Sequence, residues 1–154
     1  MTKGKVKVDV YGDPLLPVKY NNEIIPDYYM NILGEIFDMS KSPIRKIKYS
    51  YPDKKKNPSW YTRCSLRRNG KRSPILVHIV VMDTLKGHTL PRPKGVTKRE
   101  WMACPTAIKE AVRMSYQVNH INEDKHDWDP DNLEYVTARQ NQQKHQELKR
   151  YRAR

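Results

Sequence analysis

The sequence contains little cysteine and no long apolar run. Its two cysteines, Cys64 and Cys104, lack the paired spacing of a zinc knuckle or a redox motif, so a thiolate zinc site is not expected. Residues 1–5 are not followed by the apolar stretch of a signal peptide, and no segment is long and apolar enough to cross a bilayer. We therefore expect a cytoplasmic protein without a membrane partner.

Acidic residues are also scarce. Asp and Glu number 17 against 30 Lys and Arg, which gives a formal net charge of +13. Such a surplus attracts polyanions, so nucleic acid is the first partner to consider. Charge alone does not separate DNA from RNA or from an anionic membrane surface. The length of 154 residues leaves room for one domain, or for a small catalytic module with a DNA-gripping extension.

Two basic segments in the first half of the chain are candidates for phosphate contacts. Three consecutive lysines begin at Lys54 and lie beside tyrosines, although a solvated charged loop explains this run equally well. Asn69-Gly70 between β-prone stretches is a strong hairpin signal, because both residues tolerate positive φ, and the turn would carry four cations. The candidate DNA-binding residues of the two segments are Lys54, Lys55, Lys56, Arg67, Arg68, Lys71 and Arg72.

Several shorter elements can be predicted around these segments. Residues 28–39 indicate a turn at Gly34 followed by a strand, with aromatic residues in the core. Residues 78–85 are too apolar for exposure and predict a short buried helix. Thr97-Lys98-Arg99-Glu100 has the spacing of a helix capping box, and a further helix is predicted over residues 106–114.

The last part of the chain reads as a strand, a loop, a second strand and a helix. Residues 118–122 alternate apolar and polar side chains, residues 123–131 form a polar loop, and residues 132–136 return as a strand. Thr137 is placed to cap a final helix over residues 138–154, which contains no glycine or proline and has a basic end.

Three polar side chains of this frame are expected to converge. Asn141 and His145 stand four residues apart and share a helix face, beside which the hairpin would lay His120. Metal-assisted phosphodiester hydrolysis needs a base of near-neutral pKa to deprotonate water, and a cation to neutralise the scissile phosphate. Imidazoles and amide oxygens in one small volume would meet both needs.

The offsets between these residues resemble a known family. Asn119-His120, then Asn132 and then Asn141 look like the HNH motif of phage-type homing endonucleases, of the His-Me finger or ββα-metal superfamily, in the variant with Asn at the third position. The surrounding Asn-His-Ile, Asp-Asn-Leu-Glu-Tyr-Val-Thr-Ala and Gln-Asn-Gln-Gln-Lys-His are also similar. Residues 28–39 resemble more weakly the modular DNA-binding motif that often precedes such nuclease cores, and residues 77–80 resemble part of the joining segment. A phage-encoded member would act in the cytoplasm of the host cell.

The resemblance implies a role for each residue. His120 would be the general base, and Asn132 would brace the loop through its amide rather than touch the metal. Asn119 and Asn141 would be metal ligands, with His145 as a further candidate one helical turn on. Two loop residues join the candidate DNA contacts, namely Lys125 and His126.

One divalent metal ion is the expected cofactor. Asn119 stands where the family often has Asp or His, so both amide ligands would be neutral, whereas Mg²⁺ commonly relies on carboxylates plus substrate phosphate. Metal binding without DNA is therefore expected to be weak, unless Asp124, Asp127 or Asp129 lends charge. Mg²⁺ or Mn²⁺ is the expected ion, and coordination by His145 would also admit Ni²⁺ or Zn²⁺.

We therefore predict an α+β protein with two regions. Residues 97–154 would form a ββα-metal nuclease module, and residues 1–96 a small basic β-containing extension that grips double-stranded DNA. The predicted reaction is metal-dependent hydrolysis of a DNA phosphodiester to a 5′-phosphate and a 3′-hydroxyl, without an obligate protein partner. Two alternatives stay open. One is a DNA-binding protein that keeps the HNH scaffold without useful catalysis, and the other is a basic RNA-binding protein, which would need an exposed aromatic stacking platform.

Overall fold

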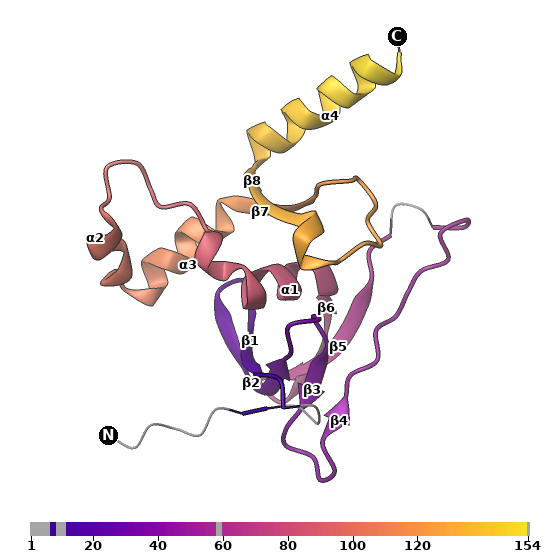
Figure 1. The fold of residues 1–154 in the computed structure, drawn as a ribbon, viewed down its shortest axis with the longest axis vertical. Helices are drawn as coiled ribbons and strands as arrows, with labels where there is room; N and C mark the ends of the chain where they lie inside the picture. The colour runs from indigo at the N-terminus through magenta and orange to yellow at the C-terminus, as the bar shows by residue number, and fades with distance from the viewer. Residues whose placement is uncertain (1–6, 9–11, 58–59, 154) are drawn as a thin grey trace.

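Four short antiparallel strands form the N-terminal sheet. The computed structural model describes residues 7–8, 12–57 and 60–153 of the chain. The strands are β1 (Leu16–Tyr20), β2 (Glu23–Met30), β3 (Ile36–Asp38) and β4 (Arg45–Lys46), and they pair in the order β1-β2-β3-β4 (Figure 1). The predicted turn at residue 34 followed by a strand is confirmed. Of the aromatic residues predicted in the core, Tyr28 is buried, whereas Tyr29 and Phe37 are half-buried.

Gly34 lies in the turn between β2 and β3, where its φ of +80° suits glycine because other residues rarely adopt it. A Cβ added here would come within 2.8 Å of the Trp128 ring. The Tyr49 hydroxyl donates to the Gly34 carbonyl at 2.5 Å, and the Tyr49 and Trp128 rings meet edge to face at 5.3 Å. The turn of the N-terminal sheet therefore packs directly against the loop that contains Trp128.

A separate two-stranded hairpin follows, formed by β5 (Arg63–Arg68) and β6 (Lys71–Leu76). Asn69 and Gly70 have φ of 49° and 77°, which matches the predicted two-residue hairpin turn. The register sets Arg67 opposite Arg72 and Arg68 opposite Lys71. Like charges directly opposite each other destabilise a strand pair, so this turn carries a cost in stability that an anionic partner would relieve.

The helix α1 (Val77–Leu85) lies at the centre of the molecule, between the N-terminal sheet and the C-terminal hairpin (Figure 1). Six of its nine residues are buried, as expected for its apolar sequence. The hydrophobic core contains Val18 of β1, Leu66 of β5, Val80 of α1 and Leu133 of the C-terminal hairpin. One core therefore joins both halves of the chain. The division into regions 1–96 and 97–154 stays a prediction.

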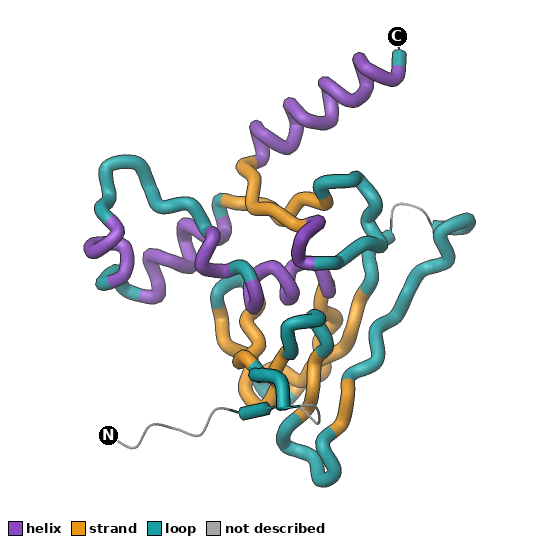
Figure 2. Tube along the Cα trace, viewed as in Figure 1, coloured by secondary structure: helices purple, strands orange, loops and turns teal. Residues whose placement is uncertain are grey.

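Two short helices project to one side of α1, after the 3₁₀ turn η1 (Gly87–Thr89) (Figures 1 and 2). They are α2 (Lys98–Met102) and α3 (Thr106–Met114), both at the predicted positions. The predicted capping box is present, because the Thr97 side chain accepts from the Glu100 amide while the Glu100 side chain accepts from the Thr97 amide. Among the described residues, no helix is both long and apolar enough to span a membrane.

The C-terminal part is a hairpin followed by a helix, as predicted. Strands β7 (Tyr116–His120) and β8 (Leu133–Thr137) are antiparallel, with η2 (Pro130–Asn132) just before β8. Strand β7 ends two residues earlier than predicted, because the chain turns at Glu123, which has a φ of 63°. Thr137 caps α4 (Ala138–Arg152) as predicted, and α4 extends away from the rest of the molecule (Figure 1).

A buried carboxylate connects these parts. Asp83 of α1 accepts from the Asn21 amide at 2.7 Å, from Arg113 Nε at 2.6 Å and from the Tyr135 hydroxyl at 2.5 Å. The side chains of Asp83 and Arg113 are only 2% and 5% exposed, and Arg113 also donates to the Tyr116 carbonyl. Burial and the neighbouring Asp83 charge raise the pKa of Tyr135. Asp83 therefore links the β1–β2 turn, α3 and the C-terminal hairpin to α1.

Replacing this carboxylate should strongly destabilise the protein. We expect Asp83→Ala to lower the free energy of unfolding by about 3–5 kcal/mol, because it leaves a buried guanidinium without its counter-charge. Urea denaturation measures the change. Asp131→Ala, which removes an exposed carboxylate, is the control and should stay within about 0.5 kcal/mol of the parent. A loss from Asp83→Ala as small as that of the control would contradict the role given to Asp83.

Candidate functional site

The hairpin β7–β8 divides the predicted site residues between its two faces. Asn119 pairs with Glu134 and His120 pairs with Leu133 across the two strands. Successive side chains of a strand point to opposite faces. Asn119 therefore shares a face with Gln117, which contacts α4, whereas His120 shares a face with the buried Leu133 and packs toward α1.

On the α4 side, polar side chains form a small network. The Asn119 amide donates to Glu134 Oε1 at 2.9 Å, and Lys144 of α4 forms an ion pair with the same oxygen. The Asn141 amide donates to Gln117 Oε1 at 2.9 Å, while its own Oδ1 is buried and accepts no hydrogen bond from the described residues. An unpartnered buried amide oxygen is costly, and a cation would satisfy it.

Glu134 is a carboxylate that the sequence analysis did not single out. Burial opposes its ionisation, but hydrogen bonds from Lys144 and Asn119 outweigh this and hold the pKa of Glu134 below its usual value. The site therefore has a negative charge next to Asn119, largely balanced by Lys144. The strand register of the predicted hairpin could have identified Glu134, because residue 134 lies directly across from residue 119.

The three aspartates considered as sources of charge have hydrogen bonds within the loop. Asp124 accepts from the His126 amide and lies 3.3 Å from Lys54 Nζ, and Asp127 accepts from the Asn122 side chain. Asp129 accepts from the amide two residues later and caps η2. None of the contacts seen among the described residues brings these three carboxylates to Asn119.

His145 faces a different neighbour from Asn141. Its Nδ1 lies 3.7 Å from Glu123 Oε1, and Arg152 forms an ion pair with the other oxygen of Glu123 at 2.7 Å. Glu123 follows closely on the end of β7, and its amide donates to the His120 carbonyl. His145 therefore lies near the turn after His120, with its imidazole oriented toward a carboxylate.

His120 lies in a stack of rings on the α1 side. Its ring centroid is 4.7 Å from that of His78 and 5.7 Å from that of Tyr61, and the Tyr61 and His78 rings stack at 4.5 Å. His120 is only 5% exposed, and its Nε2 is buried without a hydrogen-bond partner among the described residues. No described contact joins His120 to Asn141 or His145. The three side chains that were predicted to converge are therefore not in direct contact.

Burial keeps both imidazoles of this stack neutral. Desolvation lowers the pKa of His120, and the nearby charges of Asp124 and Asp127 oppose the shift without reversing it. Burial, with smaller contributions from His120 and Arg113, lowers the pKa of His78 to about 3. A general base must be unprotonated, and its accepting nitrogen must have no other hydrogen-bond partner. The neutral His120 imidazole with its unpartnered Nε2 meets both conditions.

Asn132 joins the two ends of the loop between β7 and β8. Its side-chain amide donates to the Asp127 carbonyl at 2.9 Å, and its Oδ1 accepts from the Asn122 amide at 2.9 Å. Its carbonyl also accepts from the Ile121 amide. The side chain thus spans the loop, which is the geometry expected from a brace.

The predicted DNA-binding residues occupy two places. Four are at the exposed end of β5–β6, where Arg68 also reaches Glu23 at 3.0 Å. The others are near the β7–β8 loop, because Lys54 approaches Asp124 and Lys125 Nζ lies 5.2 Å from the Tyr61 ring centroid. His126 Nε2 is buried without a partner among the described residues.

The donor set fits a hard divalent cation. Among the described residues, no three His, Cys, Asp or Glu side chains are grouped as a metal site. The candidate donors on the α4 side are instead the unpartnered amide oxygen of Asn141 and the amide oxygen of Asn119, whose amide nitrogen donates to the Glu134 carboxylate. Oxygen ligands are those that Mg²⁺ prefers, so the residues present fit the expected ion.

Part of the chain resembles a known protein family. Residues 76–143 match the family model of the HNH endonucleases. This stretch is an HNH endonuclease domain. It contains His78, His120, Asn132 and Asn141, and it begins at the end of β6, within the region predicted to be the DNA-gripping extension. No curated protein sequence matches the chain.

One solved structure is similar in fold to most of the chain. That structure is of the HNH homing endonuclease I-HmuI and concerns its binding and cleavage of DNA. The two chains match with a TM-score of 0.50 and 18% sequence identity over 80% of this chain. The chain spans about half the length of that protein, since the similarity covers 53% of it. At this identity the likeness shows the fold, and the predicted α+β architecture is thereby confirmed.

The neutral state of His78 predicts a pH-dependent stability. Its pKa is about 3 in the folded protein against 6.5 ordinarily, so the unfolded chain binds more protons below pH 6.5 and stability falls as the pH falls. Between about pH 7 and about pH 5 the loss from this one group approaches about 2 kcal/mol. Urea denaturation of His78→Leu should show a smaller loss than the parent. His88→Leu, at an exposed histidine, should retain the full loss, and equal losses in all three proteins would refute this assignment.

Proposed function

We propose that the protein is a metal-dependent HNH endonuclease that hydrolyses phosphodiester bonds of DNA, of the homing-endonuclease type. The observation that carries the proposal is the His120 imidazole, held neutral by burial at the end of β7, with Nε2 unpartnered beside a loop that Asn132 spans. Both residues lie within the stretch 76–143 that matches the HNH endonuclease family model, which supports the proposal.

In this proposal His120 acts as the general base. Its Nε2 takes a proton from water as the water attacks phosphorus, while His78 and Tyr61 fix the plane of its ring. The attacking and departing oxygens of an in-line displacement lie on opposite sides of phosphorus. A base on one face of the hairpin and metal ligands on the other therefore suit a phosphate that approaches over the end of β7. The products are a 5′-phosphate and a 3′-hydroxyl.

Asn119 and Asn141 would hold the divalent ion, Mg²⁺ or Mn²⁺. When bound, the ion supplies positive charge at the scissile phosphate and the departing oxygen. Glu134 orients the Asn119 amide through its hydrogen bond and adds negative charge nearby. His145 is a secondary candidate, because its Nδ1 lies 3.7 Å from Glu123 Oε1 and no described contact joins it to Asn141. Its participation would also admit Ni²⁺ or Zn²⁺.

Double-stranded DNA is the proposed partner. The region 1–96 and the β7–β8 loop would bind it. The opposed cations of β5–β6 support this, because phosphates would offset their mutual repulsion. In the segment that resembles a modular DNA-binding motif, Tyr28 and Ile36 are in the core, while Ile32 and Leu33 at the turn are 61% and 64% exposed. DNA contact by this segment would therefore involve the turn.

A second function is favoured by the charge of the site. Asn119 is neutral, and Glu134 is already paired with Lys144, so the chain could bind DNA on an HNH scaffold without cutting it. Incubation with supercoiled DNA and Mg²⁺ or Mn²⁺ separates the two functions. Nicked or linear DNA supports the endonuclease, and bound but intact DNA supports the inactive scaffold.

Removal of the imidazole should separate cutting from binding. We expect His120→Ala to reduce the cleavage rate by about 10²–10⁴-fold, the usual contribution of a general base, while the affinity for duplex DNA stays near that of the parent. Plasmid nicking and a gel-shift titration measure the two quantities, and a thermal melt checks that the variant folds. Unchanged cleavage by a folded variant would eliminate His120 as the base.

Metal dependence can be tested at Asn141. Chelation with EDTA should abolish cleavage, and Asn141→Ala should raise the Mn²⁺ concentration for half-maximal cleavage by at least about tenfold, because it removes the unpartnered oxygen donor. The adjacent exposed residue of α4 provides the control, Gln142→Ala, which should behave as the parent. Activity that survives thorough chelation would rule out this chemistry.

A further inference from the structure

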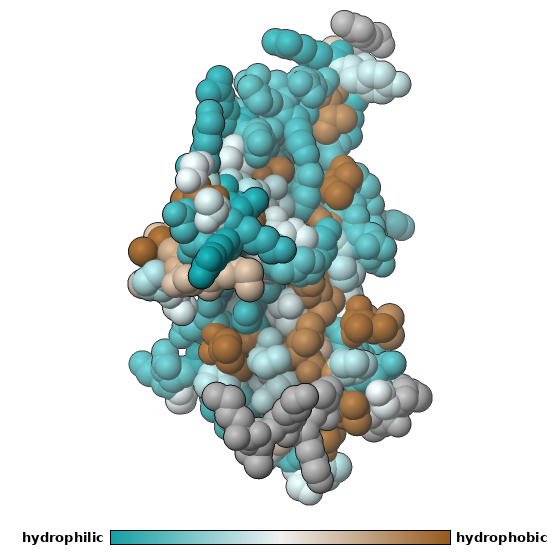
Figure 3. Space-filling view, turned by 60° about the vertical axis from the view of Figure 1, so that its left-hand side comes forward, coloured by the Kyte–Doolittle hydropathy of each residue, from teal (hydrophilic) through white to brown (hydrophobic). Residues whose placement is uncertain are grey.

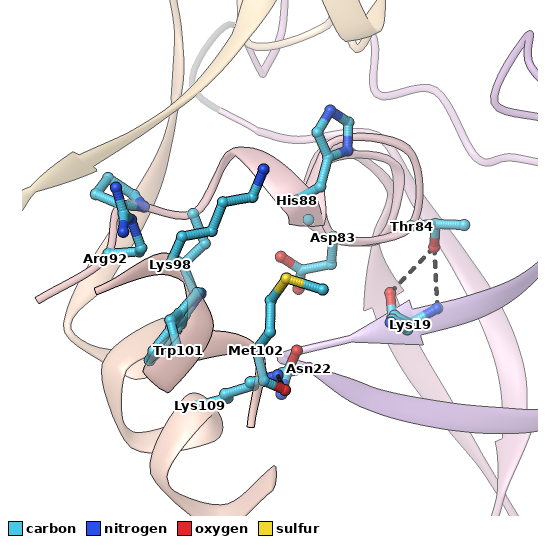
Figure 4. Close-up of a pocket in the computed structure, with 13 residues that line it drawn as sticks. Lys19, Asn22, Asp83, Thr84, His88, Arg92, Lys98, Trp101, Met102 and Lys109 are labelled. Atoms are coloured by element: carbon cyan, nitrogen blue, oxygen red, sulfur yellow. Dashed lines mark hydrogen bonds between the residues drawn. The ribbon is translucent and has the colours of Figure 1, made fainter. Parts of the chain in front are cut away.

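A cleft lies on the side of α1 where α2 and α3 project (Figure 4). Its walls come from the β1–β2 turn, the end of α1, the segment after η1, and helices α2 and α3. Its volume of about 730 Å³ lies within the range of about 300–1,000 Å³ usual for sites that take organic ligands. The cleft is therefore larger than a bare anion needs, and none of the roles proposed above uses it.

The cleft has an excess of positive charge. Asp83 is the acidic residue among the described side chains that line it, and its two oxygens already accept from Asn21, Arg113 and Tyr135. Four cationic residues line the same cleft, namely Lys19, Arg92, Lys98 and Lys109. Cations gathered in a concave surface favour an anionic ligand.

Apolar side chains stand next to these cations. Trp101 and Met102 of α2 line the cleft, and Met102 is 69% exposed. Lys109 Nζ lies 5.8 Å from the Trp101 ring centroid, so a cation and an aromatic ring share one wall. Figure 4 shows Lys98 and Met102 extending from α2 into the cleft opposite α1. Figure 3, which brings the α2 and α3 side forward, shows apolar side chains at the surface among hydrophilic ones.

We infer that this cleft binds a nucleotide of a single-stranded nucleic-acid segment. Lys98 and Arg92 bind its phosphate, and the base packs on Trp101 and Met102. Aromatic rings beside a positively charged groove are the usual means of holding unpaired strands, because every base has a face that can stack. A rigid duplex presents phosphates but keeps its bases stacked inside, so it would leave Trp101 unused.

The position of the cleft connects it with the nuclease site. Asp83 at its wall lies five residues after His78 along α1, which is about 7–8 Å on the helix axis. In this respect the inference rests on the proposed function, since the bound nucleotide would belong to a strand opened next to the cleaved bond.

The test uses the full chain, in EDTA, with a fluorescently labelled oligodeoxythymidylate of about eight nucleotides and a duplex of equal length. We expect Trp101→Ala to weaken binding of the single strand by about 5- to 100-fold, with a much smaller effect on the duplex. Trp101→Phe should restore most of the affinity, which separates loss of stacking from loss of fold. Fluorescence anisotropy measures both probes.

The charge contribution is tested with two lysines. We expect Lys98→Ala to make the dependence of single-strand affinity on salt shallower by about 0.7 in the log–log slope, whereas Lys149→Ala on α4 should change it little. Equal effects of the two lysines, or an unchanged affinity of a folded Trp101→Ala variant, would overturn the inference. Plasmid cleavage is measured separately. Cleavage without Trp101-dependent strand binding would overturn only this inference, and strand binding without cleavage would overturn only the endonuclease.

Discussion

The whole arrangement depends on one buried carboxylate. Asp83 is held by an amide of the β1–β2 turn, a guanidinium from α3 and a phenol from β8, so three distant segments meet at one side chain of α1. A charge in this setting is tolerated only because all its partners are in place. The contacts of Asp83 therefore join the N-terminal sheet to the hairpin β7–β8. They also hold α1, the helix that contains His78, in position between them.

Local signals predicted much of the fold. Asn69-Gly70 set a hairpin, Thr97 and Thr137 began helices, and the apolar run of α1 indicated burial, because each depends on neighbours within a few residues. Asp83 could not be recognised in the same way. Its partners lie between 30 and 62 residues away in the chain, and a lone Asp in an apolar stretch does not reveal which cation it meets.

The candidate site shows the same limit. The offsets of His120, Asn132 and Asn141 indicated the right domain, and the spacing also suited the loop contacts of Asn132. The direction of the His120 ring was harder to anticipate, since it depends on Tyr61 and His78 from other elements. The pair Asn119 and Glu134 lies between these two cases. Strand pairing brings the two residues together, and the pairing can be predicted once the length of the loop is known.

The glycine at the first turn illustrates how far the unity of the fold extends. Any side chain at Gly34 would meet the indole of Trp128, in the loop that also contains Asp124 and Asp127, and would adopt a disfavoured backbone conformation. A substitution at Gly34 would thus displace the β7–β8 loop beside His120, although the two residues are far apart in the sequence. A different module in place of the N-terminal sheet would therefore have to supply new packing for the Trp128 ring.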